Sequence, residues 1–313
     1  DVYAQAEVPL GESFALSGGV RTGKVKLDAS DNYLSNGDDS GQRDFSYTNP
    51  VLGLRWQVAR GLNLHASVAR GFESPTLGEL AYRTDGSGGF NTVLQPQKSR
   101  QYEVGAKWRG LDGALAIDAA LFRVTVEDEI GVATNAGGRQ SFQNVGRTLR
   151  KGAEVSLGWR FTPEWRTQMA LTLLDATYRD GFLACAGIPC TAPNVPIPSG
   201  NRIAGTQRGL AFAELAWQPS ANTELGFEVR KASPLMANDS NTEAAPGYTL
   251  LALRAVQRYK LPENFQLELL ARLDNAADKA YAGSVIVNDA NGRFYETGAP
   301  RSWLLSMRLS KSF

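Results

Sequence analysis

The sequence predicts an all-β fold, namely a transmembrane antiparallel β-barrel, and three observations support this prediction. Apolar and polar residues alternate along many segments, short turns alternate with long polar loops, and tryptophans gather beside the short turns. Alternation with a period of two is typical of strands, whereas a helix repeats its apolar face every 3.6 residues. The pattern therefore indicates strands with one apolar face and one more polar face.

The alternation is clearest near the end of the chain. In 265–274 the odd positions hold Phe, Leu, Leu, Ala and Leu, and 303–309 repeats the pattern before the terminal Phe313, which is expected to face outward. The other segments of this kind are 62–69, 102–109, 155–161, 165–173 and 223–230. Each has about the 9–11 residues that a tilted strand needs to cross a bilayer. In 114–126 the apolar phase shifts around 119–121, which indicates either a bulge or a wrong boundary.

The breaks between the strands alternate in length. The short turns are 9–12, 59–61, 111–113, 162–164, 219–222 and 260–264, and the long polar loops are 30–43, 72–99, 127–147, 179–207, 231–246 and 275–300. Alternation alone also fits a soluble sandwich with one wet face. Short turns at one end and long loops at the other are instead typical of outer-membrane barrels. Counting the segments between breaks gives about thirteen strands.

Five tryptophans lie within a few residues of a short turn. They are Trp56, Trp108, Trp159, Trp165 and Trp217. In a barrel this places them in one ring at the periplasmic interface of the membrane, where an amphipathic indole is best accommodated. A soluble core would scatter the tryptophans along the strands, so their grouping favours the barrel.

Composition and charge exclude several other classes of protein. The 313 residues include 33 basic and 32 acidic side chains, and this balance argues against a nucleic-acid partner. No stretch approaches the roughly 18 consecutive apolar residues of a transmembrane helix. Because only helices and closed barrels satisfy every backbone group in lipid, a membrane protein of this composition must be a β-barrel. With one histidine, no Gly-rich phosphate loop and no nucleophile elbow, we expect no enzyme activity, no catalytic residue and no cofactor.

The two cysteines, Cys185 and Cys190, lie five positions apart in the polar sequence CAGIPC. Two free thiols and a small disulfide ring both fit, and the Pro/Gly-rich loop around them favours the disulfide in an oxidising compartment. Zinc binding is a poor fit because there is no second cysteine pair and His65 is distant in sequence. We therefore expect a Cys185–Cys190 disulfide and no metal site.

Five ordered segments resemble motifs of TonB-dependent receptors. They are 69–80 (ARGFESPTLGEL), 94–105 (LQPQKSRQYEVG), NVG at 144–146 followed by GAE at 152–154, 273–281 from LDN to Tyr281, and GAPR at 298–301 with the terminal Phe313. Any one of these segments is a weak signal. Their occurrence in order across most of the chain makes the resemblance specific.

The resemblance implies a 22-stranded barrel in the outer membrane of a gram-negative bacterium, closed by an N-terminal plug. Residues 1–313 then form the C-terminal portion of the barrel, and the plug, the TonB-contacting box and the early strands are missing from it. An isolated open sheet would leave lipid-facing edges unpaired, which supports this interpretation. Membrane lipid and lipopolysaccharide are expected to surround such a barrel.

The resemblance also implies active import of a scarce nutrient complex, powered by the TonB–ExbB–ExbD complex acting through the plug. A ferric siderophore is the first expectation for the cargo. The segment 283–296 more weakly resembles a receptor subgroup linked to pyrroloquinoline quinone uptake, so that cofactor is an alternative cargo. A passive porin, or a surface barrel that only binds a partner, would also be built from strands of this kind, but the family motifs disfavour both.

Aromatic, basic and amide residues in the long loops are the candidates for ligand binding. They are Tyr82, Arg83, Phe90, Asn288, Arg293, Phe294 and Tyr295. Arginine binds carboxylates with two parallel hydrogen bonds, and aromatic rings stack on flat groups. The alternative is that these loop residues pack among themselves. Charged residues on the polar strand faces, including Glu224, Glu228 and Arg272, are expected to form networks in the barrel wall that hold a plug, and His65 is expected to face the lumen.

Overall fold

A computed structural model describes residues 1–85, 89–136, 139–185, 187, 190–289 and 291–311 of the chain. The terminal Phe313, which the alternation places on the outward face, lies outside these residues. Among the residues described, no helix is long and apolar enough to cross a membrane.

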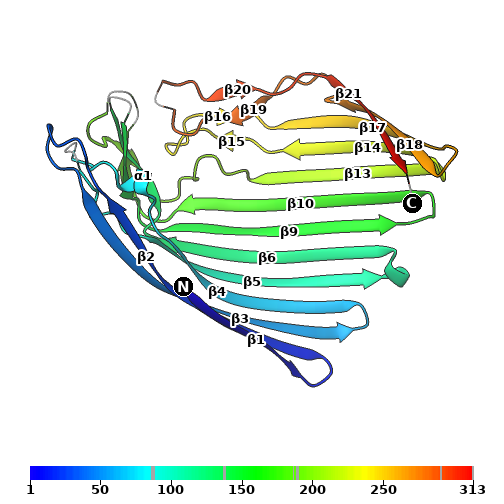
Figure 1. Cartoon of the computed structure of the whole chain (residues 1–313), viewed down its shortest axis with the longest axis horizontal. Coiled ribbons are helices and arrows are strands. Elements are labelled where there is room, and N and C mark those ends of the chain that lie inside the picture. The colour runs from blue at the N-terminus through cyan, green and yellow to red at the C-terminus, as the bar shows by residue number, and fades with distance from the viewer. Residues whose placement is uncertain (86–88, 137–138, 186, 188–189, 290, 312–313) are drawn as a thin grey trace.

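In the part of the chain that the structure describes, thirteen long strands form one curved antiparallel sheet, in which each strand pairs with the next along the sheet (Figure 1). They are β1 (Val2–Leu10), β2 (Phe14–Ala29), β3 (Gly41–Ala59), β4 (Leu62–Glu73), β5 (Gln97–Gly110), β6 (Leu115–Glu127), β9 (Thr148–Arg160), β10 (Trp165–Tyr178), β13 (Gly209–Ser220), β14 (Thr223–Ala232), β17 (Tyr248–Lys260), β18 (Phe265–Asp274) and β21 (Ser302–Lys311). This confirms the predicted all-β fold and the count of about thirteen strands.

Short turns join the strands at one end of the sheet and long loops join them at the other, as the lengths of the breaks predict (Figure 1). The short turn after β5 contains the 3-10 helix η1 (Leu111–Gly113), and the loop after β4 contains the helix α1 (Leu77–Leu80). Four loops also contain hairpins of their own: β7 (Ile130–Ala136) with β8 (Arg139–Asn144), β11 (Phe182–Ala184) with β12 (Val195–Ile197), β15 (Leu235–Met236) with β16 (Ala244–Ala245), and β19 (Ala282–Val285) with β20 (Tyr295–Thr297). Local pairing satisfies backbone groups that long irregular loops would leave open.

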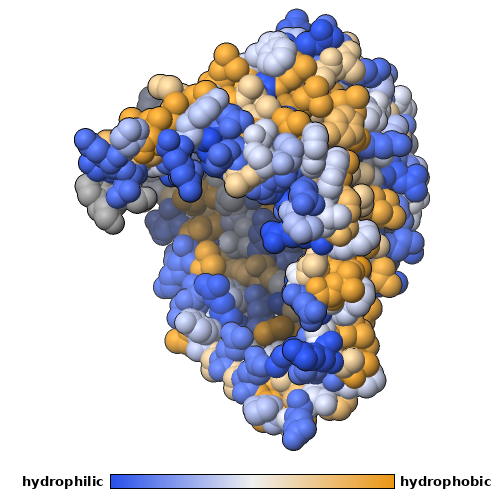
Figure 2. Space-filling model, turned by 90° about the vertical axis from the view of Figure 1, so that its right-hand side faces the viewer, coloured by the Kyte–Doolittle hydropathy of each residue, from blue (hydrophilic) through white to orange (hydrophobic). Residues whose placement is uncertain are grey.

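The register gives the sheet two chemically different faces. The face that carries Leu54, Leu64, Val104, Leu121 and Val155 is called the outer face, because the register places these residues on the same side of neighbouring strands. The five tryptophans near the short turns share this register, and Trp165 stacks on Trp217 with ring centroids 5.5 Å apart. The alternate residues form the inner face. Seen from the short-turn end, the molecule is hollowed, with apolar residues along its outside (Figure 2).

Strand β6 contains no bulge, although its apolar phase shifts along the sequence. It pairs with β5 and β9 without a register shift, and Ala119 lies on the outer face opposite Ala106 and Val155. Nearer the loops, the apolar residues Phe122, Val124 and Val126 belong to the inner face. The apolar residues change faces along β6 because the inner face borders the lumen at one end of the strand and the loops at the other.

The buried apolar clusters lie in the loops, since the sheet itself exposes both of its faces. One cluster contains Leu80, Phe90 and Leu94. A second contains Val145, Tyr178 and Ile197. These clusters fix the positions of the loop segments that carry the candidate ligand-binding residues.

Candidate ligand-binding loops and charged inner face

Asn288 joins two loops that are distant in the sequence. Its side-chain Nδ2 donates to Asp239 Oδ2 at 2.7 Å, and the backbone N–H of Asp239 donates to Asn288 Oδ1 at 3.0 Å. Asp239 also reaches the loop between β10 and β13, because its Oδ1 accepts a hydrogen bond from the backbone N–H of Ala204 at 3.0 Å. Asn201 Nδ2 donates to the carbonyl oxygen of Asp239 at 2.8 Å. Hydrogen bonds to the Asp239 carboxylate and the Asn288 carboxamide therefore join three loops, which lie between β10 and β13, between β14 and β17, and between β18 and β21.

A cavity of about 190 Å³ opens beside this junction. Its lining includes Asp239, Asn288 and Phe294. Cys185 also lines it, and the structure joins Cys185 to Cys190 by a disulfide. The cavity thus combines carboxylate and amide groups with one aromatic ring, a composition suited to a polar ligand with a flat part.

Three of the candidate residues stand together at the outer edge of this junction. Arg293 is exposed, and its backbone N–H donates to Asp289 Oδ2 at 2.7 Å. The rings of Phe294 and Tyr295 lie 6.1 Å apart. The Tyr295 hydroxyl donates to Glu243 Oε2 at 3.5 Å, and burial together with this carboxylate raises the pKa of the hydroxyl. A guanidinium and two rings are in place to meet a ligand from the loop side.

The other three candidates lie in a different loop, between β4 and β5. A capping box of Thr76 and Glu79 starts the short helix α1 there. Phe90 is only 4% exposed and packs with Leu80 in the first loop cluster. The Nε of Arg83 donates to the carbonyl oxygen of Phe90 at 3.3 Å. In this structure Phe90 serves loop packing, the alternative that the sequence left open. Tyr82 and Arg83 stay near the surface.

The inner face of β10, β13, β14 and β17 carries a connected network of charges. Arg254 donates to Glu214 Oε1 at 2.6 Å and to Glu224 Oε1 at 2.7 Å, and Arg166 donates to Glu224 Oε1 at 2.9 Å. Across β17, Arg272 of β18 donates to Glu228 Oε2 of β14 at 2.8 Å. The carboxylates are well covered, with the Glu224 side chain 9% exposed. Buried carboxylates are retained in proteins when they are paired in this way.

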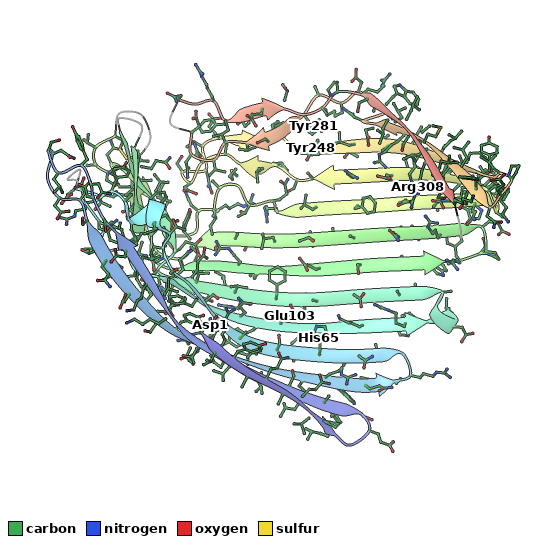
Figure 3. All side chains as sticks on the ribbon, viewed as in Figure 1. Asp1, His65, Glu103, Tyr248, Tyr281 and Arg308 are labelled. Atoms are coloured by element: carbon green, nitrogen blue, oxygen red, sulfur yellow. A yellow bond between two sulfur atoms is a disulfide. The ribbon has the colours of Figure 1, made fainter. Side chains whose placement is uncertain are left out.

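On the opposite part of the inner face the charges are sparser. His65 Nε2 lies 3.2 Å from Glu103 Oε1, and the two side chains come from the neighbouring strands β4 and β5 (Figure 3). His65 therefore faces the lumen side, as its position in the alternation predicts. Arg308, on β21, lies opposite Glu268 in the register, but the ion pair of Glu268 is with Arg258 at 2.7 Å.

Sequence reasoning missed several members of the charged network. Glu224, Glu228 and Arg272 were expected on the inner face, whereas Arg254 and Glu214 were not. The segment GLAFAELAWQPS of β13 mixes alanine into both faces, so its alternation is weak. Extending the register of β14 to its neighbours would have placed both residues, because Glu214 lies opposite Glu228 and Arg254 lies opposite Gly226.

The arrangement supports binding chemistry. In the part of the chain that the structure describes, no group of three or more His, Cys, Asp or Glu side chains is placed to hold a metal ion. What the loops offer is an exposed arginine and aromatic rings beside a small cavity, which is itself lined by the carboxylates of Asp239 and Asp289 and the amide of Asn288. The arginine and the rings can bind a flat anionic group through hydrogen bonds and stacking.

Comparison with known proteins identifies the family to which the chain belongs. Residues 1–276 match the family described as TonB dependent receptor-like, beta-barrel. The catecholate siderophore receptor Fiu of Escherichia coli K12 is 24% identical over 268 residues, which cover 83% of this chain and 32% of Fiu. The probable TonB-dependent siderophore receptor PiuA of Acinetobacter baumannii is 25% identical over 191 residues, 61% of this chain and 24% of PiuA. The chain thus spans about a third or less of the length of these relatives.

Solved structures show the same fold. The closed form of Fiu from E. coli K12 superposes with a TM-score of 0.72 and 21% identity, covering 97% of this chain and 43% of Fiu. PiuA from A. baumannii superposes with a TM-score of 0.76 and 21% identity, covering 97% of this chain and 42% of PiuA. The chain therefore belongs to the TonB-dependent receptor family, as part of its outer-membrane β-barrel.

Proposed function

We propose that residues 1–313 form the C-terminal part of a 22-stranded barrel, and that about nine further strands close it. Strand β1 pairs only with β2, and β21 pairs only with β18, among the strands that the structure describes. In lipid, free edges of this kind need partners, because unpaired backbone groups cost several kcal/mol each. Strands that connect β21 to β1 satisfy both edges and close the hollow seen in Figure 2.

The protein then works as an active importer of a ferric siderophore. A plug fills the lumen and rests against the charged inner face, and the TonB–ExbB–ExbD complex acts on that plug. The group formed by exposed Arg293 and Tyr295 and half-buried Phe294, beside the loop cavity, is the observation in this chain that carries the cargo proposal. Ferric siderophore complexes are commonly anionic and bear flat chelating groups, which suit this set of side chains. The names of Fiu and PiuA as siderophore receptors support the same class of cargo.

Uptake of radioactive iron in a strain that lacks the receptor tests the proposal. Cells that express the receptor are given a ferric catecholate or a ferric hydroxamate, with and without TonB. We expect uptake only with TonB, and Arg293→Ala should raise the half-saturating concentration about tenfold, the usual effect of losing one charge-assisted contact. Arg301→Ala is the matched control, since Arg301 is exposed in the same loop.

Each competing function gives a different result. Uptake that does not depend on TonB indicates a passive porin. Growth restored by pyrroloquinoline quinone, without iron uptake, indicates the cofactor as the cargo. Surface binding of a partner without any uptake indicates a barrel that only binds. Each of these outcomes contradicts the proposed import of a ferric siderophore.

A further inference from the structure

Four basic residues stand on the outer face at the loop end of β4, β5 and β6. Arg70, Lys98, Arg100 and Arg123 are called the outer basic cluster. They continue the register of apolar outer-face residues without a shift, since Arg70 follows Val68 and all four are exposed. In the membrane they lie just beyond the apolar band, on the side where the long loops emerge.

Three of the four members, Arg70, Arg100 and Arg123, lie directly opposite another basic residue, whereas Lys98 lies opposite Glu127. Arg70 and Arg100 are directly opposed across β4 and β5. Like charges in this position destabilise a sheet, so the arrangement is costly unless an anion lies between them. Arg123 is opposed by Lys151 across β6 and β9. The cluster thus contains one directly opposed pair of like charges, and a second such pair joins its member Arg123 to Lys151 outside it.

Nearby basic residues have carboxylate partners, but the outer basic cluster does not. Lys24 pairs with Asp44 at 2.6 Å, and Lys151 pairs with Asp175 at 3.4 Å. Within the described ranges, none of the four cluster residues forms an ion pair of 4 Å or less. The acid on the same part of the face is Glu127, opposite Lys98, and it leaves an excess of positive charge.

A pocket and a groove accompany the cluster. Arg70, Lys98 and Arg100 line a cavity of about 190 Å³ together with the hydroxyl residues Ser46 and Thr48. Further down the outer face, a groove of about 540 Å³ is lined mostly by apolar residues. Its floor contains Ala66, Ala106, Ala119 and Ala153, which are small enough to leave the hollow. Ala66 and Arg70 are four positions apart on β4, a distance of about 13 Å along the strand.

We propose that the outer basic cluster binds the phosphate groups of lipopolysaccharide, with one acyl chain in the alanine-floored groove. Arginine and lysine are the side chains that bind phosphate most strongly, and the groove offers apolar surface at the depth where acyl chains lie. The outer leaflet is the source because the long loops of outer-membrane barrels face outward. The inference rests on the membrane placement of the barrel and not on its cargo.

The test measures lipid that stays with the receptor. The receptor is purified from outer membranes in mild detergent, stripped of lipid and titrated with deep-rough lipopolysaccharide, with binding followed by native mass spectrometry. Arg70→Ala and Arg100→Ala should each weaken binding about tenfold. Lys231→Ala is the matched control, because Lys231 is an exposed basic residue at the loop end of β14. It should leave binding unchanged.

Arg100→Glu separates binding from a structural role. It places a carboxylate opposite Arg70, which should preserve or raise resistance to unfolding while lipopolysaccharide binding is lost. Ala119→Leu fills the groove and should weaken binding with the basic cluster intact.

Three results overturn the proposal. The first is unchanged binding in the arginine variants, and the second is loss of binding only in proportion to loss of stability. The third is equal competition by phosphatidylglycerol vesicles or inorganic phosphate. Iron uptake by the same variants is expected to persist, so failure of the cargo proposal is seen separately.

Discussion

Removing Arg254 should destabilise the barrel far more than removing another arginine of the same inner face. Arg254 holds two carboxylates at 2.6 and 2.7 Å, and its side chain is 18% exposed. In Arg254→Met, Glu224 keeps Arg166, whereas Glu214 loses its ion-pair partner at 15% exposure. Leaving a buried charge unpaired lowers the free energy of unfolding by about 3–5 kcal/mol. Because Glu224 keeps its contact with Arg166, we expect Arg254→Met to lower it by about 3 kcal/mol, the smaller end of this range.

Arg258→Met supplies the comparison. Arg258 and Glu268 are joined at 2.7 Å, but their side chains are 30% and 34% exposed. Water reaches this pair, so its loss should cost about 1 kcal/mol or less. Adding Glu214→Gln to Arg254→Met removes the orphaned charge and should recover at least half of the loss, since a neutral amide is easier to bury than an unpaired carboxylate.

Urea unfolding of the whole receptor in detergent, followed by tryptophan fluorescence, measures these differences. The free energy of unfolding is obtained by linear extrapolation to zero urea. Equal costs for Arg254→Met and Arg258→Met would refute the reasoning, because burial would then not govern the energy of the network. Failure of Glu214→Gln to restore stability would show that lost packing, and not an unpaired charge, explains the effect.

Two further predictions concern the loops. Asn288→Ala removes both side-chain hydrogen bonds to Asp239 and should speed hydrogen exchange of the Asp239 and Ala204 backbone amides at least tenfold. The backbone amides of β14 should stay protected. Unchanged exchange at Asp239 and Ala204 would contradict the proposed contact between the loops. The Arg147 guanidinium and backbone N–H hold the pKa of the Asp180 carboxyl at about 2, so this contact stabilises the loops fully above about pH 4 and is lost as the pH falls through about 2. The Arg147 amide should therefore lose protection from hydrogen exchange as the pH falls between these limits, and Asp180→Asn should abolish this pH dependence.

The strands and turns could be predicted from the sequence because two different environments dictate the alternation. A residue of β18 such as Leu269 meets the outer face and its neighbour Glu268 meets the inner face, so period two is imposed at every step. Period-two alternation does not apply to the loops. Phe90 was a candidate ligand contact, but burying its ring with Leu80 is more favourable than exposing it to water. No local pattern distinguishes a loop ring that binds from one that packs.

The junction at Asn288 shows a second limit. Asn288 and Asp239 are 49 positions apart, and their pairing depends on how two loops emerge from the sheet. The disulfide was easier to predict, because Cys185 and Cys190 lie close in sequence and share one loop. A contact between residues close in sequence could therefore be predicted, whereas a contact between two distant loops could not.

The order of residues along the strands carries more information than the alternation across them. On the outer face, tryptophans such as Trp108 lie at the short-turn end, apolar residues such as Val104 follow, and Arg100 lies at the loop end of the same strand β5. A sheet that faced water evenly would have no reason to sort its exposed residues in this sequence. A bilayer imposes it, because its two interfaces and its hydrocarbon core are separate environments along one strand. The sorting on β5 thus identifies both the membrane and the direction in which the barrel crosses it.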